Sequence, residues 1–454
     1  MGTTTATCWE SVDLAIDEGA EAAFSFLERL VAERSTVGHE RGAQELVASE
    51  LARLGFGVRW LEIPAETGSR APGGVAQAAY NGRSNVHGLI NPGRSPSLML
   101  NGHIDVVPAD DAVWASDPFT PVRSDGWLHG RGAGDMKAGF AMGLLAVRAL
   151  RAALPDAVSG ELSFLSVIEE ECTGNGTLSA GAAGVLGDAV VLLEPTDLGL
   201  LLGGVGVLWA EIEIEGVPAH AEAADRAVNP VHFIPLMLRA LAGFEAEINA
   251  AADDPAFGDV AQPYNVNVGA VTAGDWASSV PARAQLQVRI GFPRSWTPEQ
   301  AFGRVQAAVL GAAAADPWLA AHPPVIRQTG FRAEGYLLTE QHPLADELAA
   351  AHADAHGSPP RRLVLGSTTD ARYYINQFGR PAVAYGPTAR NIHAADEAVE
   401  LASIAAGART LARFIARFFA RGGLPGAGLP GAGPPDGLPA ARGLAGERTS
   451  REKG

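Results

Sequence analysis

Two kinds of hydrophobic pattern divide the chain. Residues 162–168 and 189–193 are apolar apart from small serines, which is typical of strands that are buried on both faces of a sheet. In residues 207–215 apolar positions alternate with Trp and Glu, which predicts a strand with only one buried face. We therefore expect two sheets that differ in how they are buried.

The same rules predict the elements around the first sheet. Helices are expected where apolar residues recur at helical spacing, and strands where short apolar runs end in Gly, Pro or Ser turns. Two helices are expected within residues 11–54, a third at 139–154, and strands at 58–63, 86–90 and 98–100. Buried strands that alternate with helices indicate an α/β fold.

The residues after 207 predict a second unit with its own order of elements. The expected elements are a strand at 207–215, a helix from Asn229 to Leu241, strands at 266–271 and 284–290, a helix with a capping box at 297–300, and a strand at 325–328. This βαββαβ order is the ferredoxin-like arrangement. Beyond it, the C-terminal residues repeat Leu-Pro-Gly-Ala-Gly, a composition that cannot bury a core and predicts a disordered tail.

Size and composition narrow the class of protein. The chain has 454 residues, of which 47% are hydrophobic and 19% charged, enough for a large core and for two or three domains. A formal net charge of -17 argues against nucleic acid or an anionic membrane as a partner. Residues 1–8 lack the pattern of a signal peptide, and no apolar run is long enough to span a membrane. The chain has only two cysteines, which argues against a disulfide framework. We therefore expect a cytoplasmic protein.

His103 and Asp105 stand at the end of the strand expected at 98–100. Residues two apart on a strand point to the same face. A histidine and a carboxylate on one face suit a metal ligand and its partner, because the Asp105 carboxylate can accept the free ring N–H and leave the other nitrogen for the metal. Taken alone, His103 could equally be a structural histidine rather than a metal ligand.

Further acids and a second histidine stand where other apolar runs end. They are the Glu triplet at 169–171, Glu194 and His393. Such strand ends are where α/β folds gather ligand sites. Two histidines and three or four carboxylates at one sheet edge suit zinc, and a dinuclear site with a shared carboxylate holds its metals about 3.5–4 Å apart. For any one of these acidic positions, the alternative to a metal ligand is a carboxylate that is simply solvated in a surface loop.

Two motifs carry a family resemblance, namely Gly-His-Ile-Asp-Val-Val-Pro at 102–108 and Gly-Ala-Gly-Asp-Met-Lys-Ala-Gly at 132–139. Together with the Glu triplet, Glu-Pro at 194–195 and Ile-His-Ala-Ala-Asp-Glu at 392–397, they resemble the acetylornithine deacetylase and succinyl-diaminopimelate desuccinylase family of zinc peptidases and deacylases. The resemblance implies a zinc-peptidase catalytic domain, with a mixed, largely parallel sheet flanked by helices, and an inserted ferredoxin-like α+β lid.

The resemblance sets the expected domain boundaries, because site motifs lie on both sides of the second unit. We expect the first part of the catalytic domain at 1–206, the lid or dimerisation domain at 207–322, the second part of the catalytic domain at 323–421, and a disordered Gly/Pro-rich tail at 422–454.

The resemblance also implies ligands for two Zn²⁺ per subunit, with Co²⁺ or Mn²⁺ as alternative metals. His103 and Glu194 would bind one ion, and His393 with one Glu of the triplet would bind the other. Asp135 would bridge the ions, and in relatives the peptide bond after this Asp is often cis. Asp105 would orient His103.

The Glu triplet departs from the Asp-Glu-Glu that is usual in the family, so two registers are open. If Glu169 takes the Asp position, Glu170 is the general base and Glu171 the ligand. If Ile168 takes it, these roles move to Glu169 and Glu170. The alternation of the preceding strand favours the first register.

Two more residues are implied by the resemblance. His220, in Gly-Val-Pro-Ala-His-Ala at 216–221, corresponds to a histidine that enters the partner subunit's active site and helps to hold the tetrahedral oxyanion, which implies a homodimer joined through the lid. Arg372 ends a family-like Ser-Thr-Thr-Asp-Ala-Arg element, and its planar fork suits a substrate carboxylate. A structural salt bridge with Asp370 is the alternative.

The predicted function is a metal-dependent amidohydrolase that removes the acyl group of a small N-acyl amino acid, or a related N-acyl compound, through a metal-activated water. A dipeptidase or carboxypeptidase of the same family is the alternative. A metal-free binding protein on the same scaffold is a second alternative, but it predicts the loss of a ligand or of the base, and the sequence retains them all.

Overall fold

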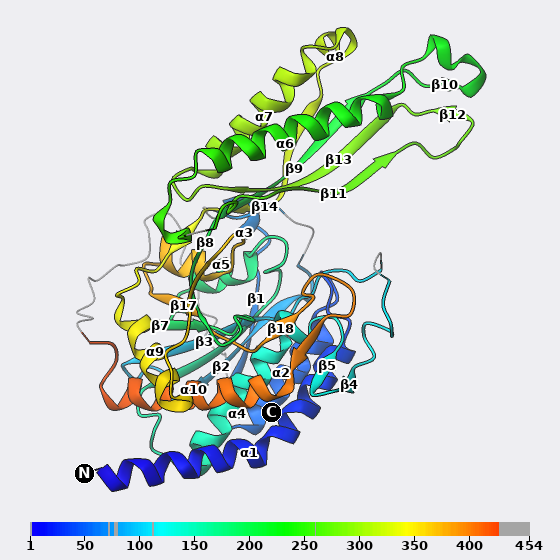
Figure 1. Ribbon diagram of the computed structural model, residues 1–454. Coiled ribbons are helices and arrows are strands. Elements are labelled where there is room, and N and C mark those ends of the chain that lie inside the picture. The colour runs from blue at the N-terminus through cyan, green and yellow to red at the C-terminus, as the bar shows by residue number, and fades with distance from the viewer. Residues whose placement is uncertain (1, 71–72, 77–79, 111–112, 259, 426–454) are drawn as a thin grey trace, which may run out of the picture.

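The computed structural model describes residues 2–70, 73–76, 80–110, 113–258 and 260–425, which form two lobes (Figure 1). The larger lobe contains the helices at both ends of the described chain, α1 (Gly2–Ala32) and α10 (Leu401–Ala420). From residue 426 onward, the predicted C-terminal tail lies outside the described residues. Within the described ranges, no helix combines the length and the apolar character needed to cross a membrane.

A nine-stranded sheet forms the centre of the larger lobe, in the order β1-β2-β6-β3-β7-β17-β8-β15 with β16 also paired to β8. Its strands are β1 (Gly57–Glu62), β2 (Ser84–Ile90), β3 (Ser97–His103), β6 (Glu161–Val167), β7 (Ala189–Leu192), β8 (Leu200–Gly204), β15 (Tyr336–Leu337), β16 (Arg362–Leu365) and β17 (Ala382–Ala384). The pairs β3–β6, β3–β7, β7–β17 and β8–β16 are parallel, and the others are antiparallel. The sheet is mixed, as predicted, but parallel pairs do not dominate it, since four of its eight strand pairs are parallel and four are antiparallel.

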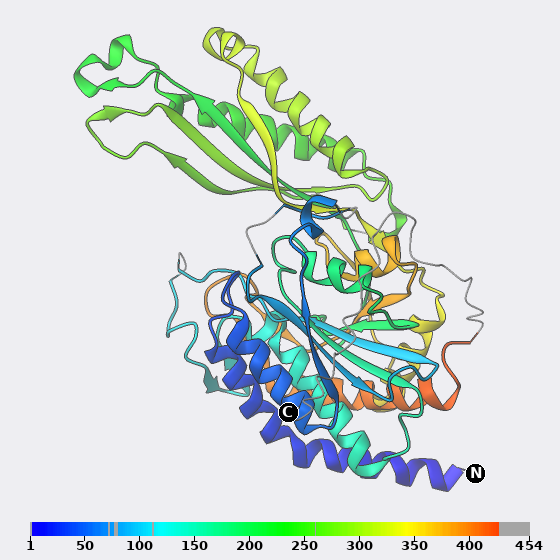
Figure 2. The ribbon, with the colours of Figure 1, turned by 180° about the vertical axis from the view of Figure 1, so that it is seen from behind.

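The two faces of this sheet bury different residues of the same strands. Leu98 and Leu100 of β3 belong to an apolar cluster that also contains residues of α1, α4 (Ala138–Ala153) and α10. Met99, between them, packs on the opposite face with residues of α5 (Asn175–Ala182) and the π-helix η5 (Tyr373–Gln377). Figure 2 shows α1 and α4 packed together on one side of the sheet. Both faces are thus covered, which explains the nearly continuous apolar runs.

The remaining elements of the larger lobe surround this core. The helix α2 (Arg41–Arg53) packs against β1 and β2, and α9 (Pro343–His356) packs against α10. A small four-stranded sheet has the order β18-β19-β5-β4, with β18 (Ala389–Arg390), β19 (Ala398–Glu400), β5 (Trp127–His129) and β4 (Val122–Ser124). This small sheet joins two segments that are far apart in the sequence and that both lead into the candidate site.

The smaller lobe is a four-stranded antiparallel sheet, in the order β11-β13-β9-β14, with two helices on one face. In chain order its elements are β9 (Gly206–Glu215), α6 (Ile234–Ala250), β11 (Val266–Ala273), β13 (Arg283–Phe292), α7 (Pro298–Ala313) and β14 (Val325–Ala333). Ile212 and Ile214 of β9 are buried and lie in one apolar cluster with Leu241 of α6 and Val305 of α7. Among the described residues, no helix of the smaller lobe packs on the opposite face of the sheet, so side chains of that face line the space towards the larger lobe.

The two lobes are joined by short links. β8 ends at Gly204 in the large sheet and β9 begins at Gly206 in the small lobe, while β14 ends at Ala333 and β15 begins at Tyr336 back in the large sheet. Neither glycine leaves room for a side chain, since a Cβ at Gly206 would lie 2.1 Å from the Phe292 ring. The close links place the open face of the small sheet over the strand ends of the larger one.

Candidate metal centre

Strand ends of the large sheet present most of the candidate ligands. His103 is the last residue of β3, the Glu triplet follows β6, and Glu194 follows β7. Because β3 is parallel to both β6 and β7, their carboxyl ends lie at the same edge of the sheet. Asp135 comes from the π-helix η1 (Ala133–Lys137), and His393 from the loop between β18 and β19.

Two groups of three side chains share Asp135. His103 Nε2 lies 3.1 Å from Asp135 Oδ1 and 3.8 Å from Glu194 Oε2. His393 Nε2 lies 3.4 Å from Asp135 Oδ2 and 3.1 Å from Glu171 Oε1. The two oxygens of Asp135 therefore face different histidines. The peptide bond that follows Asp135 is cis, as expected.

These spacings fit donors around metal ions. Atoms bound to one tetrahedral Zn²⁺ at about 2.0–2.1 Å are about 3.3 Å from one another. Donor atoms of His103, Asp135 and Glu171 all lie within 4.8 Å of one another. Imidazole nitrogens and carboxylate oxygens are donors that zinc accepts in proteins. The residues present thus fit a pair of divalent ions, with one histidine for each.

Electrostatics at the cluster favour cations. Burial alone lowers the pKa of the His103 ring, but the Asp135 hydrogen bond and the Glu194 charge outweigh it and hold that pKa well above its usual range. The Glu171 carboxylate raises the pKa of His393 to about 11. Burial raises the pKa of Glu194 to about 8. The directions of these shifts are consistent with an excess of carboxylates around the two histidines, a charge that divalent cations would neutralise.

Asp105 makes a different contact from the one predicted. His103 Nδ1 lies 2.9 Å from the main-chain oxygen of Asp105 and 3.7 Å from its Oδ1, so the ring N–H donates to the carbonyl, and the carboxylate lies at ion-pair distance without the predicted hydrogen bond. The carboxylate instead accepts the amide N–H groups of Glu170 at 3.2 Å and Glu171 at 3.1 Å. The physical reason is that these two buried amides follow the end of β6 and have no strand partner.

The three glutamates of the triplet lie in different surroundings. Glu169 is wholly buried, accepts a hydrogen bond from the Tyr80 hydroxyl at 2.7 Å and pairs with Arg83 at 2.6 Å. Glu170 and Glu171 both face the cavity described next. This arrangement favours the register in which Glu170 is the base and Glu171 the ligand, with Glu169 held away from the site.

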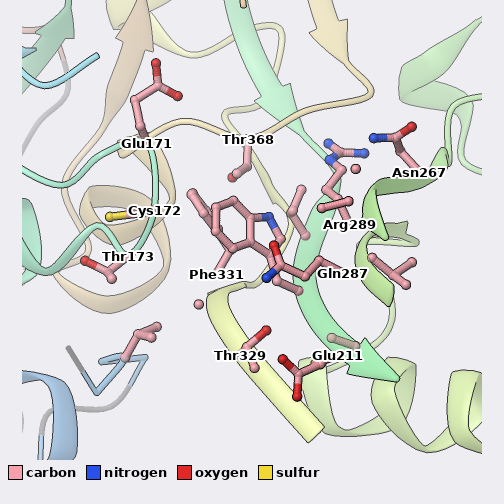
Figure 3. Close-up of a pocket in the computed structure, with 18 of the residues that line it drawn as sticks. Glu171, Cys172, Thr173, Glu211, Asn267, Gln287, Arg289, Thr329, Phe331 and Thr368 are labelled. Atoms are coloured by element: carbon pink, nitrogen blue, oxygen red, sulfur yellow. The ribbon is translucent and has the colours of Figure 1, made fainter. Parts of the chain in front are cut away.

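A cavity of 730 Å³ lies between the two lobes and contains part of the site. Glu170, Glu171 and His393 line it from the larger lobe. The smaller lobe contributes residues from the open face of its sheet, among them Trp209, Glu211, Asn267, Gln287, Arg289 and Thr329. Figure 3 shows Glu171, Cys172 and Thr173 across the cavity from Asn267, Gln287 and Arg289.

Glu170 has the environment of a general base. Its side chain is 9% exposed, and burial raises the pKa of its carboxyl well above the usual range. The Nη1 atom of Arg372 lies 3.9 Å from its Oε1. A carboxylate with a raised pKa accepts a proton from water more readily near neutral pH.

Arg372 lies beside Glu170 but outside the large cavity. It is only 3% exposed. Its guanidinium lies over the rings of Phe331 at 4.8 Å and Tyr373 at 4.4 Å, and Nη2 is 3.3 Å from Asp370 Oδ1. The ion pair with Asp370 supports the structural alternative. The rings cover only the faces of the guanidinium, and among the described residues its N–H edge, which is the part that binds a carboxylate, has no hydrogen-bond partner.

Arg289 is a site residue that the sequence analysis misses. It lines the cavity from β13, and its Nη2 donates to the main-chain oxygen of Gly366 at 3.0 Å. Within the described residues, no carboxylate lies within ion-pair distance of it. Burial lowers its pKa. The sequence signal was a cation at a polar position of the strand expected at 284–290, but only the packing of the lobes shows what that face of the strand contacts.

His220 lies away from these groups within its own chain. It belongs to β10 (Ala219–His220), which pairs with β12 (Ser279–Val280) at the outer end of the smaller lobe (Figure 1). Its exposed ring accepts a hydrogen bond from the Glu222 amide at 3.2 Å. One chain therefore does not bring His220 to the candidate metal centre.

Comparisons with known proteins give a consistent family. Residues 99–417 match peptidase family M20/M25/M40. The succinyl-diaminopimelate desuccinylase of Caulobacter vibrioides is 30% identical over 407 residues, which cover 87% of this chain and 95% of that protein. Among solved structures, the di-peptidase Dug1p of Saccharomyces cerevisiae superposes with a TM-score of 0.75 at 15% identity, over 90% of this chain and 98% of that one. Human carnosine dipeptidase 1 superposes with a TM-score of 0.71 at 16% identity, over 90% of this chain and 99% of that one.

Proposed function

Because the chain belongs to peptidase family M20/M25/M40 and is a metal-dependent hydrolase of amide bonds, we propose that it removes the acyl group of a small N-acyl amino acid that carries a free carboxylate. One observation carries the proposal, namely the sharing of Asp135 between two groups of histidine and glutamate. The relatives named succinyl-diaminopimelate desuccinylase make N-succinyl compounds the first class to test. The two cysteines of the chain suit a reducing compartment, so we infer a cytoplasmic enzyme.

Two zinc ions are the proposed cofactors. His103 and Glu194 would hold one ion and His393 and Glu171 the other, with Asp135, whose two oxygens face the two histidines, available to both. When bound, such a metal pair supplies Lewis-acid activation of a water molecule and of the scissile carbonyl. Co²⁺ or Mn²⁺ would accept the same donors.

Glu170 is the proposed proton carrier. Its carboxylate takes a proton from the attacking water and returns it to the nitrogen of the leaving amine. Asp105 fixes the main chain at this point, because its carboxylate accepts the amides of Glu170 and Glu171. The base and the neighbouring ligand are therefore held by a single buried side chain.

Arg289 takes the role that the sequence analysis gives to Arg372. Its guanidinium lies in the cavity without a carboxylate partner among the described residues, and it could donate two charge-assisted hydrogen bonds to a substrate carboxylate. The cavity volume of 730 Å³ is within the usual range for small-molecule sites, about 300–1,000 Å³. An acylated amino acid is of a size that fits this space.

A second copy of the chain completes the proposed site. His220 is exposed at the outer end of the smaller lobe, where it can reach another subunit but does not line its own cavity. In a homodimer joined through the smaller lobes, the partner's His220 would donate a hydrogen bond to the oxygen that gains charge when the carbonyl is attacked.

The test is a hydrolysis assay of the purified full chain with and without a chelator. N-succinyl, N-acetyl and N-formyl amino acids and a set of dipeptides are the substrates, and Glu170→Gln is the inactive control. The proposal predicts chelator-sensitive release of one acyl class from substrates with a free carboxylate. Cleavage of dipeptides alone would assign the chain to the peptidases of its family, and the absence of chelator-sensitive cleavage would overturn the proposal.

A further inference from the structure

Glu397 joins two segments that each carry a proposed metal ligand. It stands four residues after His393 and is 1% exposed. Its Oε1 accepts the amide N–H groups of Gly134 and Asp135, both at 2.9 Å, and its Oε2 accepts that of Gly132 at 3.0 Å. One carboxylate thus satisfies three buried amides of the loop that presents Asp135.

Arg131 extends this contact to a third segment. Its Nη1 donates to Glu397 Oε2 at 2.7 Å, and the Arg131 side chain is 2% exposed. Its Nη2 lies 3.5 Å from the main-chain oxygen of Pro108, in the segment that follows His103 and Asp105. The guanidinium also lies over the Trp114 ring at 5.0 Å. The Glu397–Arg131 pair therefore touches all three segments that meet around Asp135.

The amides of Gly132, Gly134 and Asp135 depend on this carboxylate because they stand at the start of η1, where amide N–H groups have no partner within the helix. Gly132 has a φ of 79°, in the left-handed region. Gly134 lies so close to the next segment that a Cβ there would be 2.6 Å from the Ala389 Cβ. Buried amides in such a loop need acceptors from elsewhere, and a charged acceptor makes stronger hydrogen bonds than a neutral one.

We propose that Glu397 is a positioning residue for the metal centre, which holds the Asp135 carboxylate at the distance from His393 that lets it serve both ions. The inference rests on the proposed function, since it takes Asp135 and His393 as ligands. Residues that support metal ligands in this way typically affect metal affinity roughly 10–100-fold when they are replaced. Glu397 itself touches neither the substrate cavity nor, in the proposal, a metal ion.

The test compares zinc affinity in Glu397→Gln and Glu397→Asp, measured by calorimetric titration of the metal-free full chain. Gln has almost the same shape but presents an NH2 group to the donors of Arg131 or of the loop, so we expect roughly 10–100-fold weaker zinc binding. Asp keeps the charge but is one methylene shorter, so its affinity should lie between those of Gln and the wild type. Glu247→Gln, on the exposed face of α6, is the matched control and should bind zinc as the wild type does.

Circular dichroism and thermal unfolding of the metal-free variants separate positioning from folding. If Glu397 positions the ligands, its folded variants should bind zinc more weakly even where the Tm of the metal-free protein stays near the wild type. Excess zinc should then restore part of their kcat. Lower stability with wild-type zinc affinity in Glu397→Asp would overturn the inference and leave a structural role only. If Glu397→Gln does not fold, the same comparison of zinc affinity with the Tm of the metal-free protein is made for Glu397→Asp and Arg131→Lys. Failure of the proposed function is distinguishable, because a wrong metal centre would leave the wild type without bound zinc, and a wrong substrate class would change the cleavage assay but not the zinc affinities.

Discussion

The two lobes contribute to the cavity in different ways. In the larger lobe the candidate ligands stand at sheet edges and buried loops, where Asp105 and Glu397 fix their main chain. In the smaller lobe Arg289 lies on an open sheet face, and His220 is at an exposed outer end. In the proposed function, the larger lobe therefore carries the chemistry, while the smaller lobe selects the substrate and completes the site of a second copy. Substitutions in the two lobes should therefore change different kinetic constants.

The largest expected effect is in the larger lobe, at Glu170. Glu170→Gln keeps the shape of the side chain but cannot accept a proton, so kcat should fall by about 10²–10⁴. Zinc content and KM should remain close to the wild type, because Glu170 is not a proposed ligand. Steady-state kinetics with metal analysis check this. A fall of less than about tenfold would show that another group moves the proton.

The next effect is in the smaller lobe, at His220. His220→Ala should lower kcat by about 10²–10³, the usual cost of one lost donor to an oxyanion. If the donor comes from the partner, mixing His220→Ala chains with Glu170→Gln chains should restore activity, because each mixed dimer has one intact site. Equal mixing should recover about a quarter of the wild-type rate. No recovery in a mixture shown to exchange subunits would contradict the role of the second copy.

A smaller effect is expected at Arg289, and it should appear in KM. Arg289→Met removes a charged donor from the cavity, and the loss of hydrogen bonds to a charged group, about 1.5–3 kcal/mol, corresponds to a roughly 10–150-fold rise in KM. Arg289→Lys should recover part of the loss. Arg372→Met tests the alternative, since a KM effect confined to Arg372 would return the substrate role to that residue.

The smallest expected effect concerns stability, away from the site. Burial lowers the pKa of His87 to about 4 and that of His352 to about 4. Both rings are neutral in the folded chain, so their contribution is complete above the unfolded pKa near 6.5 and is lost as the pH falls from about 6.5 towards 4. The variant His87→Gln with His352→Asn keeps hydrogen-bonding groups towards Ser163 and Tyr385, and its denaturant midpoint should fall less steeply with acid. Parallel pH profiles would contradict this.

Residues at the ends of apolar runs could be predicted from the sequence, because a parallel sheet brings such ends to one edge. His103 and Glu194 are examples. The register of the triplet could not be settled in this way, because Glu169 has a φ of 67° and the alternation of β6 ends before it. β14 is longer than predicted because its register shifts between Thr329 and Arg332 and interrupts the pattern.

Contacts between side chains that are far apart in the sequence could not be predicted, for a different reason. A period of two tells which residues of β13 share a face, but not that Arg289 on that face meets the strand ends of the other lobe. In the same way, a His-x-Asp spacing does not tell whether the carboxylate or the carbonyl of Asp105 takes the ring N–H. These choices depend on contacts between segments that are far apart in the chain.

The most direct test of the account is a zinc titration of the metal-free chain and of two ligand variants. We predict that the wild-type chain binds two zinc ions. His393→Ala should bind one ion tightly, because the His103 group remains. Asp135→Asn should bind both ions weakly, because both groups lose their shared carboxylate. A single ion in the wild type, or two ions of unchanged affinity in Asp135→Asn, would contradict the shared centre on which the larger lobe's role depends.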